Sequence, residues 1–149
     1  MPRILFICTA NYYRSRFAEA VFNHLAHRRG IDWTAFSRGF IPEEAPDGLS
    51  PHAANGLRLV GVSEEFLPKE KKALAEEDFE HADRIIALKK DEHEPMVMER
   101  FPAYADRFVY WDVGDLPLVS PPQAMLSIKE NIERLLDELE GSPKGNRNA

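Results

Sequence analysis

The feature of this sequence that most limits its fold is an alternation of short apolar segments with segments of helical periodicity. Residues 3–7 (RILFI) and 84–88 (RIIAL) are almost entirely apolar and rich in branched side chains, as is typical of parallel strands covered on both faces. Residues 33–39 and 107–111 are two further predicted strands. Strands separated by helices predict an α/β fold in which helices cover both faces of a parallel sheet.

Five segments have the pattern of helices or contain a short one. Residues 14–29 carry apolar side chains at helical spacing and are followed by Gly30, and a second helix is predicted at residues 52–60. Residues 69–79 read as loop and short helix, and residues 91–100 as an acidic helix with Pro95 in its first turn. The last helix begins near Pro122, ends at Gly141 and has an apolar face made by Met125, Ile128, Ile132, Leu135, Leu136 and Leu139.

The length of the chain, 149 residues, and a hydrophobic content of 44% are enough for one domain with its own core. We see no internal repeat and no second domain. We therefore expect a single domain over residues 1–141 and a disordered tail over residues 142–149.

The net charge of −6 and the isoelectric point near 5.4 argue against nucleic acid or an anionic membrane surface as a partner. The apolar start of the chain lacks a cleavage site for a signal peptide, and no stretch is long enough to cross a bilayer. The single cysteine, Cys8, excludes an internal disulfide and a cysteine-rich zinc cluster. A lone thiol is typical of a reducing compartment, so we expect a cytoplasmic protein.

The chemistry of the chain is predicted to lie in residues 8–15 (CTANYYRS), between the first strand and the first helix. The carboxyl end of a parallel strand is where ligands bind in such folds, and Cys8 lies at this end. A loop that leads into a helix presents converging backbone N–H groups at the positive end of the helix dipole, which is the geometry of an anion site. The loop residues expected around a phosphate are Thr9, Ala10, Asn11, Tyr12, Tyr13, Arg14 and Ser15.

Three side chains of this loop have predicted roles. The field that holds an anion also favours the thiolate form of Cys8, which is the nucleophile. Arg14 can grip two phosphate oxygens with its planar guanidinium, and Ser15 can donate a hydrogen bond to the Cys8 sulfur. Asn11 tolerates the left-handed backbone that a tight loop needs. A lone cysteine is more often a small buried hydrophobe, but the C-x5-R-S spacing at a strand-to-helix turn favours a phosphate site.

These residues resemble a known family, the low-molecular-weight protein tyrosine phosphatases. The resemblance covers CTANYYRS with the following AEAVF, then SRG at residues 37–39, EEDFEHADRIIAL at residues 76–88 and WDVGD at residues 111–115. It implies a doubly wound, three-layer α/β sandwich with a four-stranded parallel sheet. It also implies phosphomonoester hydrolysis without metal or cofactor, through a cysteinyl-phosphate on Cys8 with Arg14 stabilising the transferring group.

The resemblance further implies the substrates and partners of such an enzyme. The substrate would be a phosphorylated protein, with phosphotyrosine as the expected side chain, or a small phosphomonoester, and inorganic phosphate would be the product. The enzyme would be a monomer or weak dimer.

The resemblance assigns two more roles. Asp115 matches the family's general acid, and Asp112, three residues earlier, is its competitor. Ser37 and Asn11 match residues that brace the loop through hydrogen bonds. A histidine that often joins this network in eukaryotic relatives is missing, with Lys69 as the nearest positional match.

The sequence departs from the family pattern at the rim of the expected site. Ala10 stands where glycine is usual, and Tyr12 and Tyr13 replace a small residue and, in many relatives, a second cysteine. Tyr12 either forms a wall of the substrate entrance or packs on a neighbouring loop. After Asp115, a proline and aromatic residues are replaced by Leu116, Pro117 and Leu118, which puts the preference for phosphotyrosine in question.

Two other functions compete with this interpretation. A phosphate-binding module without catalysis is suggested by the departures, but binding alone requires neither a thiolate nor an acid. Arsenate reductases of this fold relay a disulfide through additional cysteines, which this chain lacks.

The remaining polar groups are expected to be structural. The five histidines have no partner at metal-ligand spacing and are all predicted at the surface: His24, His27, His52, His81 and His93. The acidic runs at residues 43–44 and 76–78 are predicted to be solvated. Phe40 and Ile41 either line the cleft or pack under the loop.

Overall fold

The computed structural model describes residues 1–113 and 119–141. Four strands form one parallel sheet in the order β2-β1-β3-β4. Their bounds are Arg3–Cys8 for β1, Thr34–Gly39 for β2, Arg84–Ala87 for β3 and Phe108–Tyr110 for β4. The predicted doubly wound, three-layer sandwich with a four-stranded parallel sheet is confirmed. The bounds of the predicted strands differ from the observed ones by one residue at one end, or at both ends for β4.

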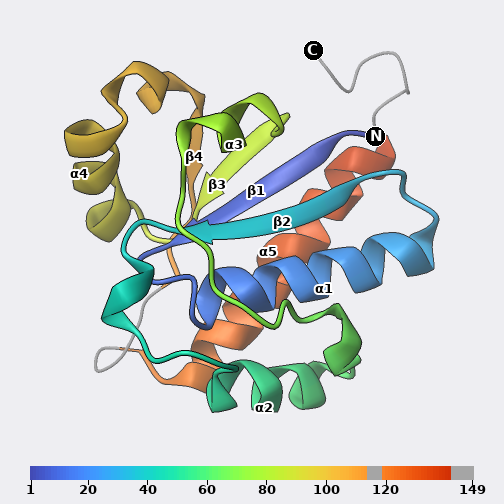
Figure 1. Cartoon of the computed structure of the whole chain (residues 1–149). Coiled ribbons are helices and arrows are strands. Elements are labelled where there is room, and N and C mark those ends of the chain that lie inside the picture. The colour runs from blue at the N-terminus through green and yellow to red at the C-terminus, as the bar shows by residue number, and fades with distance from the viewer. Residues whose placement is uncertain (114–118, 142–149) are drawn as a thin grey trace.

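Helices cover both faces of the sheet (Figure 1). One layer contains α1 (Arg14–Arg29), α2 (Pro51–Val60) and α5 (Pro121–Gly141), and the other contains α3 (Glu76–Glu80) and α4 (Lys90–Arg100). Short 3₁₀ turns η1 (Pro42–Glu44), η2 (Glu64–Phe66) and η3 (Pro102–Arg107) lie in the connections. No helix within the described ranges is both long enough and apolar enough to span a bilayer.

Strand β1 is buried on both faces, and its alternating side chains divide between two cores. Ile4, Phe6 and Cys8 belong to the core under α1, α2 and α5. Leu5 and Ile7 belong to the core under α3 and α4. This is why the strand is continuously apolar in sequence instead of alternating with polar residues.

The helix ends follow from local sequence. Gly30 and Gly61 adopt left-handed conformations after α1 and α2, with φ of 67° and 73°. At the start of α2, Ser50 accepts the backbone N–H of Ala53 and Pro51 occupies the first turn.

The predicted place of Pro95 in a first turn is wrong, because α4 begins at Lys90 and contains Pro95 in its interior. The extra turn is held by tertiary contacts of Glu92 and His93 with the loop after β1. Glu92 and His93 lie 83 and 84 positions from Thr9 in the sequence, so local sequence does not reveal these contacts.

The order of the strands places a crevice at the carboxyl end of β1. The chain leaves β1 to reach β2 on one side, and β3 and β4 lie on the other, so β1 is the topological switch point. Figure 1 shows the strand ends gathered beside the start of α1. Cys8 is the last residue of β1 and Arg14 the first of α1, so the loop between them lies in this crevice.

Candidate active site

A pocket of about 260 Å³ lies over the loop of residues 8–15. Loop residues including Cys8, Ala10 and Tyr12 form its floor and one wall, and Glu44, Ala45 and Glu92 contribute from neighbouring segments. All the residues from 8 to 15 line the pocket except Asn11 and Ser15, which are buried. Those two lie beneath it.

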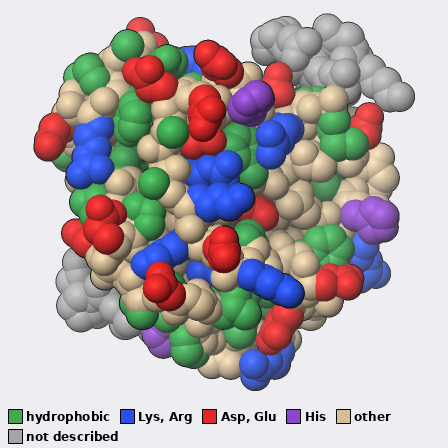
Figure 2. Space-filling view, in the orientation of Figure 1, with side chains coloured by type: hydrophobic (Ala, Val, Ile, Leu, Met, Phe, Trp, Pro, Cys, Tyr) green, Lys and Arg blue, Asp and Glu red, His purple; other side chains and the backbone are tan. Residues whose placement is uncertain are grey.

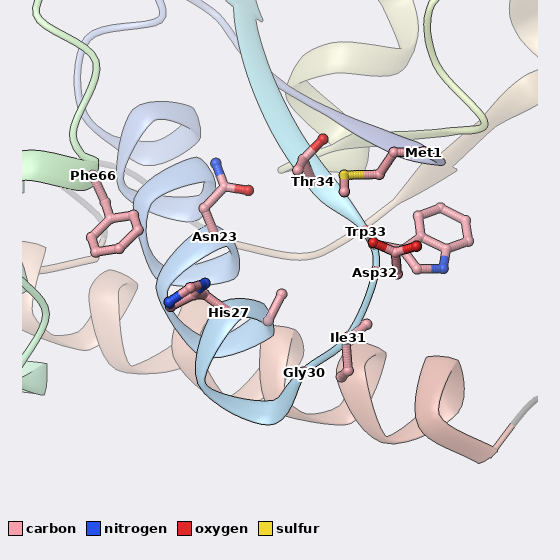
Figure 3. Close-up of a pocket in the computed structure, with 10 residues that line it drawn as sticks. Met1, Asn23, His27, Gly30, Ile31, Asp32, Trp33, Thr34 and Phe66 are labelled. Atoms are coloured by element: carbon pink, nitrogen blue, oxygen red, sulfur yellow. The ribbon is translucent and has the colours of Figure 1, made fainter.

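A larger hollow of about 520 Å³ lies far from these residues, at the end of α1 and the start of β2. Figure 3 shows Asn23 and His27 along the helix and Trp33 ahead of the strand. The Asn23 side chain that lines it is already hydrogen-bonded, because it donates to and accepts from the backbone of Ala35 at 3.1 and 2.8 Å. None of the predicted site residues lines this hollow, so its size does not mark the active site.

Cys8, the predicted nucleophile, has a hydrogen-bond partner within the same loop. Cys8 is 3% exposed, and its Sγ lies 3.0 Å from the Ser15 hydroxyl oxygen. The Asn11 side-chain amide donates to that same oxygen at 2.7 Å, and the Ser15 hydroxyl can donate to the sulfur when Cys8 is a thiolate, which can only accept. Asn11 adopts the left-handed conformation expected of it, with φ of 53°.

The bracing network continues beyond the loop to a buried carboxyl group. Asn11 donates its second amide hydrogen to Ser37 at 3.0 Å, and Ser37 donates to Glu19 Oε1 at 2.8 Å. The side-chain oxygen of Asn11, Oδ1, accepts a hydrogen bond from the backbone N–H of Lys72 at 2.8 Å. The hydrogen bonds of this network therefore run in one order, from the Lys72 backbone to Asn11, from Asn11 to Ser37 and from Ser37 to Glu19. Lys69 is exposed and takes no part in these bonds.

Glu19 is the titratable member of the network. Burial raises the pKa of Glu19 to about 7, against the opposing effects of the Ser37 hydrogen bond and the charges of Arg38, Arg16 and Lys72. The sequence analysis did not identify this residue. The signal was present, because Glu19 is the one acidic residue on α1 and its neighbours Ala18 and Ala20 are buried.

The end of β2 approaches the loop so closely that only glycine fits there. A Cβ at Gly39 would lie 2.5 Å from the Asn11 backbone nitrogen and 2.6 Å from the Ala10 carbonyl carbon. Beyond Gly39, the backbone N–H groups of Phe40 and Ile41 donate to the carbonyl oxygens of Cys8 and Thr9 at 3.2 and 2.7 Å. Phe40 is buried, so of the two alternatives for this pair, packing under the loop is the observed one.

Arg14 is held by a carboxylate from α4. Its terminal nitrogens donate to the two Glu92 oxygens at 3.2 and 2.7 Å, and one of them also donates to the Val113 carbonyl at 3.1 Å. Burial alone would raise the pKa of Glu92, but hydrogen bonds from His93, Arg14 and Thr9 and the charge of Arg14 outweigh it and lower that pKa far below its usual range. Glu92 is therefore a carboxylate whenever the site is assembled.

Glu92 was not among the site residues predicted from the sequence. It lies in the first turn of the helix after β3, and β3 pairs with β1, so parallel topology brings it beside the loop. This spatial relation was the available signal.

Two expectations about solvated polar groups are wrong. His93 is fully buried and lies against Glu92 and Thr9, whereas His27, His52 and His81 are exposed and His24 is half-buried. Asp78 is also buried, because its carboxylate accepts from the Ala75 backbone at 2.9 Å and from Arg38 at 3.2 Å. Tertiary contacts withdraw both side chains from water despite the charged sequences around them.

The two candidate general acids differ in what the structure shows of them. Asp115 lies outside the described residues, as do Leu116, Pro117 and Leu118. The Asp112 side chain is 83% exposed and forms an ion pair with Lys89, and it does not line the pocket.

The two tyrosines of the loop have different surroundings. Tyr12 is half-buried and lines the pocket while also packing on the core beneath α1. Tyr13 is buried, with its ring edge-on to His52 at a centroid distance of 5.8 Å. Of the two alternatives for Tyr12, the wall of the entrance is therefore the observed one, and its packing is against the core.

The part of the chain that the structure describes contains no group of three or more His, Cys, Asp or Glu side chains able to hold a metal ion. The site consists of a thiol, an arginine and a serine hydroxyl around one anion-sized loop at the switch point of a doubly wound sheet. Together these features define a cysteine-dependent phosphatase.

Comparisons with known proteins give the same class. A sequence model described as low molecular weight phosphotyrosine protein phosphatase matches residues 3–141, and the chain belongs to this family. Among curated proteins, a protein-arginine-phosphatase of Bacillus subtilis is 29% identical, with 97% of this chain and 98% of that protein covered. A protein-arginine-phosphatase of Geobacillus stearothermophilus is also 29% identical, with 93% and 95% covered.

Solved structures are similar over the same length. A low molecular weight protein tyrosine phosphatase from T. tengcongensis superposes with a TM-score of 0.77 at 28% identity, covering 93% of this chain and 99% of that one. A mutant of the YwlE arginine phosphatase with a phosphorylated active-site serine gives a TM-score of 0.79 at 26% identity, with 99% of both chains covered.

Proposed function

We propose that this cysteine-dependent phosphatase hydrolyses phosphate monoesters of protein side chains through a cysteinyl-phosphate on Cys8, without a metal ion. The observation that carries the proposal is the Cys8 sulfur at the floor of the loop pocket, 3.0 Å from the Ser15 hydroxyl and on the same loop as Arg14. The loop amides of residues 9–15 and the Arg14 guanidinium bind the phosphate oxygens, which stabilises the charge that develops during transfer.

The first half-reaction transfers the phosphoryl group to sulfur. The Cys8 thiolate attacks phosphorus, the bond between phosphorus and the leaving oxygen breaks, and that oxygen takes a proton from the carboxyl group of Asp115. The role of Asp115 comes from its position in the family motif. The ion pair of Asp112 with Lys89, outside the pocket, supports Asp115 over Asp112.

The second half-reaction releases inorganic phosphate. The Asp115 carboxylate removes a proton from water, the water oxygen attacks phosphorus, and the sulfur–phosphorus bond breaks to return the thiolate. The Ser15 hydroxyl stabilises the sulfur as the leaving group here, as it stabilises the nucleophile in the first step.

For the substrate we propose phosphotyrosine. The pocket wall formed by Tyr12 presents an aromatic ring at the entrance, and an aryl phosphate placed on Cys8 would stack against it. Phosphoarginine is a second candidate, favoured by the Glu44 carboxylate at the pocket and by the arginine phosphatases among the curated relatives. An anionic group at the entrance attracts a guanidinium leaving group.

We also propose a setting for the enzyme. The single thiol supports a reducing compartment such as the cytoplasm, and acidic and basic side chains are interspersed on the face shown in Figure 2. The large apolar side chains most exposed among the described residues, such as Leu59, Met98 and Val109, come from α2, α4 and β4, which supports a monomer or weak dimer of one domain over residues 1–141.

The test is steady-state hydrolysis of p-nitrophenyl phosphate between pH 5 and 8 with chelator present, wild type against Cys8→Ser. Turnover that resists the chelator and is lost in Cys8→Ser, while the variant still binds vanadate, is the expected result. Tight vanadate binding without turnover by the wild type would instead identify a binding module.

Two peptides that differ only in the phosphorylated residue, phosphotyrosine in one and phosphoarginine in the other, then decide the substrate. We expect Tyr12→Leu to reduce kcat/KM for the phosphotyrosine peptide alone. A faster reaction with the phosphoarginine peptide, reduced by Glu44→Gln, would overturn the assignment to phosphotyrosine.

A further inference from the structure

His93 is buried completely in a stretch of sequence that is otherwise charged, KDEHEP. It lies in the first turn of α4, and the ring of Phe40 packs against it with a centroid distance of 5.7 Å and an interplanar angle of 31°. A histidine withdrawn from water needs partners for its ring nitrogens. Both nitrogens have partners here, and they lie in the direction of the active site.

The tautomer of the ring is set by the backbone. The Lys89 N–H donates to His93 Nδ1 at 3.1 Å, so Nδ1 must be the acceptor and Nε2 must carry the hydrogen. A second proton on Nδ1 would face a donor instead of an acceptor. The ring is therefore neutral in this arrangement and presents one N–H group on its far side.

That N–H group faces the carboxylate that holds Arg14. His93 Nε2 lies 3.1 Å from Glu92 Oε2 and 3.1 Å from the Thr9 hydroxyl oxygen. The same Glu92 oxygen accepts from Thr9 and, at 2.7 Å, from Arg14. Glu92 is 31% exposed and Arg14 only 2%, so the carboxylate is the part of this pair with more freedom to move.

We propose that His93 is a positioning residue for catalysis, which fixes the Glu92 carboxylate so that Glu92 in turn fixes the Arg14 guanidinium. The proposal rests on the proposed role of Arg14 in phosphate binding. Arginine and glutamate side chains both carry considerable rotamer entropy, and a guanidinium that must be oriented during each turnover stabilises the transition state less well. A rigid ring, clamped by the backbone on one side, supplies that orientation in advance.

Packing alone is the alternative explanation of His93. In that case any substitution would disturb α4 and the loop together, whether or not Glu92 is present. The positioning role makes a different prediction, since it acts only through the carboxylate.

Two amide variants separate the two ring contacts. The Asn side chain in His93→Asn places its oxygen near Nδ1, where it accepts the Lys89 N–H, but does not reach Glu92. The longer side chain in His93→Gln reaches the position of Nε2 and donates to Glu92. Each is made alone and combined with Glu92→Gln, and Val97→Ala, a buried change one turn further along α4, is the packing control.

The measurements are kcat and KM for p-nitrophenyl phosphate, the dissociation constant of vanadate, and the thermal midpoint. We expect His93→Asn to lower kcat/KM by about tenfold and His93→Gln by clearly less, with Val97→Ala lowering the thermal midpoint without this loss. In the Glu92→Gln background, His93→Asn should cause less than about a twofold further change, because the group through which it acts has been altered.

Equal losses for His93→Asn with and without Glu92→Gln would overturn the proposal, as would wild-type kinetics in His93→Asn. If His93→Asn does not fold, the same comparison is made with His93→Ala, which also removes the donor to Glu92. Failure of the proposed function is distinguishable, since it removes Cys8-dependent turnover from the wild type. The coupling of His93 to Glu92 then still shows in vanadate affinity.

Discussion

The Ser15 hydroxyl oxygen lies 3.0 Å from the Cys8 sulfur, and both atoms are buried. A Cys8 thiolate can only accept, so the Ser15 hydroxyl, whose oxygen also accepts from Asn11, donates to the thiolate and stabilises its negative charge. The proposed nucleophile is thus coupled to a network that runs from the loop into α1 and β2.

This contact predicts the effect of Ser15→Ala. A hydrogen bond to a charged group is worth about 1.5–3 kcal/mol, so we expect kcat for aryl phosphates to fall between about tenfold and a hundredfold. Ser50→Ala is the control, because Ser50 is equally buried but caps α2. Rapid mixing that resolves phosphoenzyme formation and breakdown should show both steps slowed, and unchanged rates would mean that the serine bond does not serve catalysis.

The assignment of the general acid predicts how the effect of Asp115→Asn depends on the leaving group. An alkoxide or phenoxide of high pKa needs a proton more than nitrophenolate does, so kcat should fall by about 10²–10⁴-fold for phenyl phosphate and much less for p-nitrophenyl phosphate. In Asp112→Asn, only the ion pair with Lys89 is lost, and little change is expected for either substrate. The reverse pattern would make Asp112 the acid.

The buried carboxyl of Glu19 predicts a pH dependence of stability. Its pKa is raised to about 7 from an ordinary value of 4.5, so the folded state holds the proton over a range in which the unfolded chain has lost it. Stability therefore falls as pH rises from about 4.5 to 7, by about 3 kcal/mol in total, and the loss persists above pH 7. Below pH 4.5 both states are protonated, and this loss of stability is absent.

Glu19→Gln removes this dependence while keeping an oxygen to accept the Ser37 hydrogen. Urea unfolding at pH 5 and pH 8 should show that the variant gains stability relative to wild type at the higher pH. Glu99→Gln, at an exposed position on α4, serves as the control. Parallel pH profiles for wild type and Glu19→Gln would contradict the prediction.

The approach of β2 to the loop predicts a specific defect in Gly39→Ala. The new methyl group would meet the backbone of Ala10 and Asn11 at 2.5–2.6 Å, and neither strand nor loop can yield without moving the phosphate site. We expect vanadate to bind at least about tenfold more weakly and stability to fall by about 1–3 kcal/mol.

Gly56→Ala is the matched control for this clash, since a Cβ there meets the side chains of Met125 and Phe17 at 2.8–2.9 Å. It should cost stability while leaving vanadate affinity unchanged. Equal effects of both variants on vanadate binding would show that the loop responds to general loosening of the core.

Much of the fold followed from the sequence because its signals are local. The continuous apolar run of β1 reflects burial on both faces, and the helical spacing after Arg14 together with Gly30 gave α1 its bounds. The loop chemistry was equally local, since Cys8, Asn11, Arg14 and Ser15 lie within eight residues and their spacing suits only a tight anion-binding turn. The Asn11 conformation and the contact between Ser15 and Cys8 were predicted on this basis and observed.

Tertiary structure decided what surrounds the loop. Glu92 and His93 reach it only because β3 pairs with β1, and Glu19 acquires its unusual pKa only because α1 packs on the sheet and excludes water. In the sequence, Glu92 and His93 look like solvated positions of a charged segment, whereas Glu19 is a single acidic residue in an apolar stretch. The sequence thus determined the loop and its predicted nucleophile, while the sheet topology determined which distant carboxylates and which ring contact that loop, because burial and long-range hydrogen bonds exist only once the strands have paired.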